Sequence, residues 1–195
     1  MRLDAAILRQ LVVRVDVTDY VRIVRRAYKD KPLGMGFGKT RFSSPKDAFK
    51  LLYLAQDTRT AVAETIIRDR FQDKAKRVLL EDEFDGFSIA AISKADPLVL
   101  IDLRHEGASL LGVSTDAVRA RTQRPGRNLS QALYTRTMLD GIVYMSRITN
   151  RECVAVYDRA VPKLESAGPA LDLPRLGSLT ADLAALHVTV IKRPA

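Results

Sequence analysis

The sequence is poor in the residues that build covalent cross-links and metal centres. Its 195 residues include one cysteine, Cys153, two histidines and no tryptophan. A single cysteine excludes an intramolecular disulfide and a cysteine-rich zinc site. The two histidines, His105 and His187, occur in no nucleophile motif, so serine or cysteine hydrolase chemistry is disfavoured. We expect no metal, with His105 in a surface loop and His187 as a structural residue of a strand.

Long apolar runs are also missing. None approaches the roughly 18 residues of a membrane span, and the start, MRLDAAILRQL, lacks the apolar core and cleavage site of a signal peptide. The apolar fraction of 47% is ordinary for a globular protein. The sequence therefore predicts a cytoplasmic protein that forms one domain over residues 1–195 and has no membrane partner.

Charge is abundant but unevenly placed. The formal net charge is +9, and residues 1–80 hold 18 basic and 9 acidic side chains, whereas residues 81–195 hold 14 of each. The positive excess thus lies in the N-terminal two-fifths of the chain. Such an excess is typical of a protein that meets an anionic partner.

The apolar pattern predicts many short strands and fewer helices. Because strands and helices do not alternate regularly, a doubly wound parallel sheet is disfavoured, and we expect an α+β fold with a mixed, largely antiparallel sheet and flanking helices. A surface loop is expected over Ser166–Gly177. The expected strands are Leu11–Val17, Tyr20–Val24, Lys50–Ala55, Arg77–Leu80, Phe87–Ile92, Leu98–Asp102, Gly141–Met145, Cys153–Tyr157 and His187–Ile191. The expected helices run from Asp57 or Thr58 to Phe71, Ser114 to Arg121, Asn128 to Leu139 and Ser178 to Leu186.

Three glycines, Gly34, Gly36 and Gly38, alternate in the segment KPLGMGFGKT. The dinucleotide-binding fingerprint would need a helix opening on the third glycine, and Pro45 with two serines follows instead. We therefore interpret the run as a flexible loop that needs positive φ angles. A mobile loop that closes over a ligand is the alternative.

The segment from Arg22 to Glu64 carries the residues with the clearest chemical potential. Arg22 and Arg41 flank the glycine run, and two guanidinium groups suit a diphosphate. Tyr53 follows on an expected strand and offers a flat face to an aromatic ring. Glu64 is flanked by small and apolar residues in TAVAETII, and a carboxylate on a mostly apolar helix face needs a partner or a function. The segment suggests a pocket for a phosphorylated aromatic ligand, the alternative being unconnected residues of a ligand-free core.

The same residues stand in the order of a known family pattern. Arg22–Ile23, Arg41–Phe42, Tyr53–Leu54–Ala55 and Glu64, eleven residues past Tyr53, are followed by NLSQAL and GIVYMSR. Over residues 12–160 this set resembles the RES-domain family, the toxin components of bacterial toxin–antitoxin pairs. Phe42 stands where that family usually has tryptophan, and Lys39–Thr40 replace glycines. The spacing leaves open whether the family's serine is Ser130 or Ser146, with Ser43 and Ser44 as further contenders.

The resemblance implies a fold similar to ADP-ribosyltransferases and an enzyme whose substrate is NAD. Such toxins either degrade NAD or transfer its ADP-ribose to a target. The resemblance assigns to Glu64 the stabilisation of positive charge on the ribose, and to Arg22 and Arg41 the binding of the pyrophosphate or ribose. Tyr53 would stack on the nicotinamide, and Ser130 or Ser146 would bond the amide or ribose. No metal is implied.

Two further expectations concern partners. The resemblance implies a cognate helical antitoxin that blocks the pocket, and a cationic surface would favour an acidic inserted segment. The rival hypothesis is a nucleic-acid-binding or ribonuclease toxin that uses Arg25, Arg26, Lys29 and Lys31 as its phosphate footprint. Against it, the basic residues of this part of the chain alternate with Asp16, Asp19 and Asp30. The acceptor of the ADP-ribose is not determined by the sequence.

Overall fold

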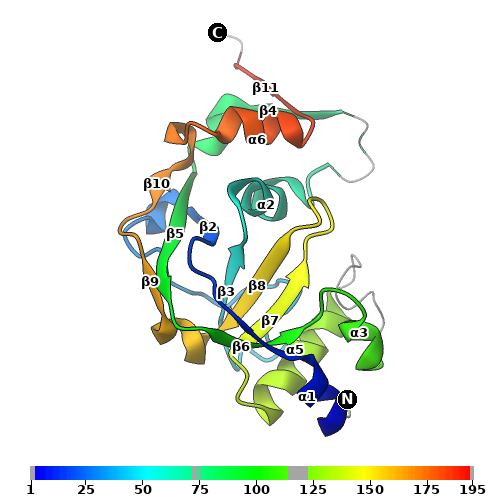
Figure 1. Ribbon diagram of the computed structural model, residues 1–195. Helices are drawn as coiled ribbons and strands as arrows, with labels where there is room; N and C mark the ends of the chain where they lie inside the picture. Colours follow the sequence, from blue (N-terminus) through cyan, green and yellow to red (C-terminus); the bar gives the residue numbers. More distant parts are fainter. Residues whose placement is uncertain (1–2, 72–73, 75, 114–122, 194–195) are drawn as a thin grey trace.

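The computed structural model describes residues 3–71, 74, 76–113 and 123–193. Among them nine strands form one sheet in the order β1-β6-β7-β8-β3-β2-β5-β10, with β9 paired to β5 (Figure 1). All pairs in this sheet are antiparallel except β6–β7. The strands are β1 (Val12–Val15), β2 (Val21–Arg25), β3 (Leu51–Ala55), β5 (Phe87–Ala95), β6 (Leu98–Asp102), β7 (Gly141–Met145), β8 (Glu152–Tyr157), β9 (Leu164–Ser166) and β10 (Leu171–Asp172). The predicted α+β class with a largely antiparallel sheet is confirmed.

The remaining strands, β4 (Arg77–Leu80) and β11 (Val188–Ile191), form a separate parallel pair. In Figure 1 this pair and α6 lie at the top, α2 lies beneath them, and α1 and α5 lie at the bottom. The helices are α1 (Ala5–Leu11), α2 (Thr58–Val62), α3 (Gly107–Leu110), α5 (Arg124–Arg136) and α6 (Leu179–Ala185). Short 3₁₀ turns occur at Arg26–Tyr28, Glu81–Phe84, Asp158–Lys163 and Leu173–Arg175. Within the described ranges, no helix combines the length and apolar character needed to cross a bilayer.

Several predicted boundaries were wrong for identifiable reasons. The run Leu11–Val17 is a strand only over Val12–Val15, because the preceding residues form α1, whose first turn is capped by the Asp4 carboxylate. Helix α5 begins at Arg124, with Pro125 in its first turn, and not at Asn128. The predicted loop Ser166–Gly177 contains β10, which pairs with β5. The helix expected over Ser114–Arg121 lies outside the described residues.

Both histidines are exposed. His105 lies in a bend, as predicted, but His187 precedes β11 with a φ of 54° instead of belonging to the strand. A left-handed residue at this point ends α6 and turns the chain into β11.

The two faces of the central strands serve different cores. Alternation directs Leu52 and Leu54 of β3 into one buried cluster, and Tyr53 and Ala55 toward the other, which also contains Ile66 of the helix after β3. The cluster on the Tyr53 side of the sheet also contains side chains from α2, α5 and α6. The side chains of Ile142 and Tyr144 in β7 and of Cys153 and Ala155 in β8 belong to the same cluster as the helix that follows β3.

The sheet opens between β2 and β3. These neighbours pair at one position only, Val21 with Ala55, although β2 pairs along its full length with β5, and β3 with β8. The two strands thus diverge from Val21 and Ala55 toward Ile23 and Tyr53. A gap lined by two strand backbones is the result, and it lies under the helix that follows β3.

Candidate functional site

A cavity of about 300 Å³ lies at the opening between β2 and β3. The two strands, the helix after β3, and residues of β7 and β8 form its wall. Its lining residues are Val21, Arg22, Ile23, Thr40, Tyr53, Leu54, Ala55, Ala61, Glu64, Thr65, Arg68, Tyr144 and Cys153. Glu64 is the one carboxylate among these lining residues.

Glu64 is held on a widened helical turn. The Asp57 carboxylate accepts a 2.7 Å hydrogen bond from the Thr60 amide at the start of α2, as its predicted capping role requires. Beyond α2 the chain continues as a π-helical turn over Ala63–Ile67, closed by the Arg68 amide bonding the Ala63 carbonyl at 2.8 Å. Such turns insert one extra residue and recur at functional sites. Both Glu64 and Thr65 line the cavity as a result.

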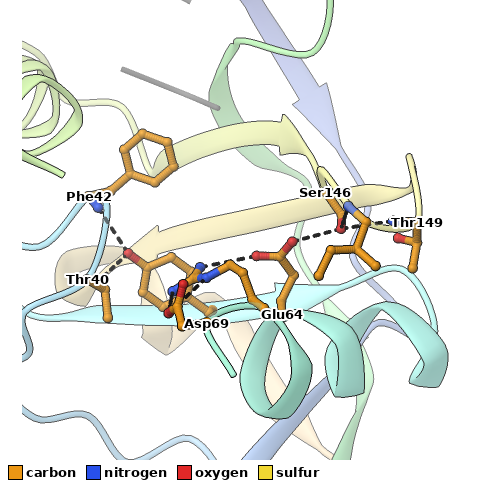
Figure 2. A network of polar contacts seen from close by, with 9 residues as sticks. Thr40, Phe42, Glu64, Asp69, Ser146 and Thr149 are labelled. Atoms are coloured by element: carbon orange, nitrogen blue, oxygen red, sulfur yellow. Dashed lines mark hydrogen bonds and ion pairs between the residues drawn. The ribbon is translucent and has the colours of Figure 1, made fainter. Parts of the chain in front are cut away.

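Ser146 is the predicted serine that lies beside Glu64. It follows β7, and its hydroxyl donates to Glu64 Oε1 at 2.7 Å while accepting from the amides of Ile148 and Thr149 at 3.2 and 3.3 Å (Figure 2). Ser130 lies elsewhere, fully buried on α5, where its hydroxyl contacts the Tyr157 hydroxyl at 3.2 Å. Of the two serines left open by spacing, the structure brings only Ser146 to Glu64.

Tyr53 projects from β3 into the cavity and is fixed at its hydroxyl. That oxygen lies 2.7 Å from the Thr40 hydroxyl and accepts a 3.3 Å bond from the Phe42 amide (Figure 2). Thr40 is one of the departures from the family pattern noted above. The side chain that replaces a glycine thus ties the end of the glycine-rich loop to β3.

The two predicted arginines are arranged differently from each other. Arg41 is 8% exposed, and its Nη1 is buried without a hydrogen-bond partner in the described part of the chain. Burial lowers its pKa, and Glu64 is near enough for its charge to oppose that effect. Arg22 lines the cavity, but its Nη1 donates to the carbonyls of Pro32 and Gly34 at 2.9 and 3.2 Å. Its Nε is buried without a partner among the described residues.

Arg22 therefore holds the start of the glycine-rich loop. The expectation of positive φ angles in this loop was wrong, because the described glycines with positive φ are Gly112 and Gly168. Gly34 is required for a different reason: a Cβ there would stand 2.9 Å from the Lys31 carbonyl oxygen. Close approach of two backbone segments explains this glycine.

Arg68 is the site residue that sequence reasoning missed. It lines the cavity, and its Nη1 donates to Glu64 Oε2 at 3.2 Å. The signal was present in the sequence, because a carboxylate and a guanidinium four residues apart face each other on a helix. This position is not part of the family pattern.

The electrostatics of the cavity single out Glu64. Burial raises the pKa of Tyr53, and burial raises the pKa values of Tyr144 and Cys153 as well. All three groups therefore stay protonated and neutral near pH 7. The cavity combines one carboxylate with the guanidinium groups of Arg22 and Arg68 and with neutral hydroxyl groups, whereas Arg41 is not among the lining residues, although its charge interacts with that of Glu64.

The described residues contain no group of three or more histidine, cysteine, aspartate or glutamate side chains arranged to hold an ion. The functional groups that line the cavity are a paired carboxylate, hydroxyl groups and guanidinium groups.

Comparison with known proteins gives three consistent matches. The RES domain family matches residues 12–176. The protein named probable toxin y4kH of Sinorhizobium fredii is 40% identical over 93 residues, which is 46% of this chain and 73% of that protein. A chain in the crystal structure of the M. tuberculosis MbcT–MbcA toxin–antitoxin complex aligns with a TM-score of 0.61 and 14% identity, covering 87% of this chain and 90% of that one. At that identity the last match shows a shared fold.

Proposed function

The chain belongs to the RES-domain family, and from that premise we propose that it is the toxin of a toxin–antitoxin pair that cleaves NAD at the nicotinamide–ribose bond. The observation that carries this proposal is the Glu64 carboxylate, held at 2.7 Å by Ser146 in a cavity beside a buried, incompletely bonded arginine. The ADP-ribose goes to water, to phosphate or to a protein target. Growth arrest follows from NAD loss or from modification of that target.

The proposed reaction suits a site with one carboxylate. The C1′–N bond breaks and its electron pair stays on the ring nitrogen, which turns the pyridinium cation into neutral nicotinamide. Positive charge passes to the ribose, and a nucleophile then bonds to C1′ and releases a proton. Glycosyl transfer of this kind uses carboxylates beside the anomeric carbon. Glu64 supplies the negative charge that faces the developing cation.

The buried arginines support an anionic substrate. Leaving a guanidinium nitrogen buried and unbonded is costly, so Arg41 Nη1 and Arg22 Nε call for an acceptor that the described protein atoms do not provide. The pyrophosphate oxygens of NAD are such acceptors. We assign Arg41 to the pyrophosphate or the adjacent ribose. Arg22 acts on the same group by holding the glycine-rich loop in place.

The remaining predicted residues take positions around this core. Tyr53 offers its ring to the nicotinamide, and its hydroxyl, already bonded to Thr40, fixes the ring plane. Ser146 orients Glu64. Ser130 has no place in the proposed chemistry, because its hydroxyl is bonded to Tyr157 on α5.

The cationic N-terminal part bears on the partner. Several of its basic groups are used within the protein: Arg26 pairs with Asp172 at 3.1 Å, Arg59 with Asp182 at 3.5 Å, and Arg25 stacks on Phe87. This internal use weakens the case for a nucleic-acid surface. We propose that the remaining excess attracts an acidic segment of a helical antitoxin toward the cavity.

The test is direct. Purified protein is incubated with NAD, with and without cell lysate as acceptor, while free nicotinamide is measured and the ADP-ribose product is identified by mass spectrometry. We expect nicotinamide release in at least one condition. No NAD consumption in either, together with salt-sensitive binding of generic RNA, would replace this proposal with the ribonuclease alternative.

The two serines provide an internal comparison. Ser146→Ala removes the hydroxyl that fixes Glu64, so we expect a slower release of nicotinamide, together with a loss of about 1–2 kcal/mol of unfolding free energy because that hydroxyl also accepts from two backbone amides. Ser130→Ala breaks a buried hydrogen bond and is expected to cost about 1–2 kcal/mol of unfolding free energy, with activity retained below the melting temperature. Nicotinamide release and thermal unfolding of both variants check this, and the reverse assignment of effects would contradict it.

A further inference from the structure

Arg68 lies between two carboxylates of its own helix. Its Nη1 donates to Glu64 Oε2 at 3.2 Å, and its Nε and Nη2 donate to Asp69 Oδ2 at 3.3 and 3.2 Å. In Figure 2 the Glu64 carboxylate lies between Ser146 on one side and Asp69 on the other. The exposed fractions of the side chains differ: 15% for Glu64, 18% for Arg68 and 68% for Asp69. The guanidinium therefore connects an enclosed carboxylate to a solvent-facing one.

The carboxylate of Glu64 is held at both oxygens. Ser146, beyond β7, bonds Oε1, and Arg68, one turn along the helix, bonds Oε2. The last torsion of a glutamate side chain is broad, so one anchor leaves the carboxylate plane free to rotate. Two anchors on different elements set that plane relative to the cavity.

Asp69 fixes the orientation of the Arg68 guanidinium, the second group that holds the Glu64 carboxylate. A guanidinium is planar, so bonds that hold its Nε and Nη2 fix the direction in which its Nη1 hydrogens point. Because Asp69 lies on the solvent side, it orients Arg68 without occupying the cavity. A lysine at this position would keep the positive charge, but its single ammonium could not be oriented in the same way.

We infer that Arg68 is a positioning residue that fixes the Glu64 carboxylate toward the substrate ribose, with Asp69 as its external anchor. This inference deepens the proposed function and rests on it for its kinetic consequences. Since Arg68 also lines the cavity, a direct contact with the substrate is the competing role, and the experiment is arranged to separate the two.

The kinetic test compares R68Q, R68K, D69N and E64Q with wild type, measuring kcat and KM for nicotinamide release. Misplacement of a reacting group by about 1 Å can cost about 10²-fold in rate, so we expect R68Q to lower kcat by about that factor with KM little changed. R68K and D69N should lose less than R68Q. R70Q is the matched control, because Arg70 pairs with Glu83 outside the cavity.

The double variant E64Q/R68Q is decisive. If Arg68 acts through Glu64, adding R68Q to E64Q lowers kcat no further, because the coupled effects are not additive. If the loss of kcat in the double variant equals the product of the two single losses, Arg68 binds the substrate directly and the positioning role is overturned. A raised KM with normal kcat in R68Q would lead to the same conclusion. An R68Q enzyme as active as R70Q would also overturn it.

A second measurement does not depend on NAD. Ligand-free crystal structures of wild type, R68Q and R70Q are compared for the Glu64 side chain. We expect one carboxylate orientation in wild type and R70Q, and several in R68Q. A single Glu64 orientation with the Ser146 bond intact in R68Q would overturn the inference. If wild type consumes no NAD, the proposed function fails, while this comparison still decides whether Arg68 positions Glu64.

Discussion

Glu64→Gln is expected to lower the rate of NAD cleavage by about 10²–10³-fold, equivalent to about 2.7–4 kcal/mol of transition-state stabilisation, by analogy with the loss of a preorganised oxyanion-hole donor. The substitution keeps the size of the side chain and its ability to bond Ser146. It removes the negative charge that faces the ribose cation. Because Tyr53, Tyr144 and Cys153 remain neutral, no other lining group replaces that charge.

The measurement is the initial rate of nicotinamide release at saturating NAD, with thermal unfolding as a check of folding. Glu165→Gln is the matched control, since Glu165 is 65% exposed and pairs with Lys94 on the surface. We expect the control to match wild type. A Glu64→Gln protein with wild-type turnover would remove the carboxylate from the proposed mechanism, whatever the fate of the ADP-ribose.

Gly141→Ala is expected to lower the free energy of unfolding by about 3 kcal/mol or more. Gly141 begins β7, and a Cβ there would stand 2.2 Å from the Ala155 carbonyl oxygen and 3.1 Å from Val156 Cα, both in β8. These are backbone atoms of a central strand that also pairs with β3. The strand cannot withdraw without disturbing both ladders. The glycine that opens the GIVYMSR motif is thus explained by close strand approach.

Urea or thermal unfolding measures this effect. For a chain of this size, about 3 kcal/mol corresponds to a melting temperature lower by roughly 6–12 °C. Gly177→Ala is the control, because a Cβ at Gly177 meets no atom within 4 Å and its φ is not in the left-handed region. Its unfolding free energy should stay within about 0.5 kcal/mol of wild type. Equal stability of the two variants would contradict the packing argument.

Local signals predicted most of the sheet. The predicted apolar runs of β3, β7 and β8 lie within one residue of their observed bounds, because buried central strands favour aliphatic, aromatic and β-branched residues. The two-residue strand β10 could not be predicted, since Leu171 and Asp172 become a strand only through pairing with β5. The separation of β2 from β3 is likewise a property of the assembled sheet. A single domain over residues 1–195 stays a prediction.

The site was predictable where its residues are close in sequence. Tyr53 lies on a strand and Glu64 on the helix that directly follows it, so their proximity is determined by a short stretch of sequence. Ser146 could not be separated from Ser130 by spacing, because the choice depends on which strand end reaches the Glu64 helix. The contact between Arg68 and Glu64 was predictable from their four-residue spacing, although Arg68 lies outside the family pattern.

The Glu64–Ser146 bond joins residues that are 82 positions apart. Chains are synthesised at about 5–20 residues per second, so roughly 4–16 s pass on the ribosome between the addition of Glu64 and that of Ser146. During that interval the nascent chain has the carboxylate but not the hydroxyl, β7 or β8 that complete the cavity wall. Translation therefore delays the assembly of the cavity around Glu64 until β7 and β8 have been added.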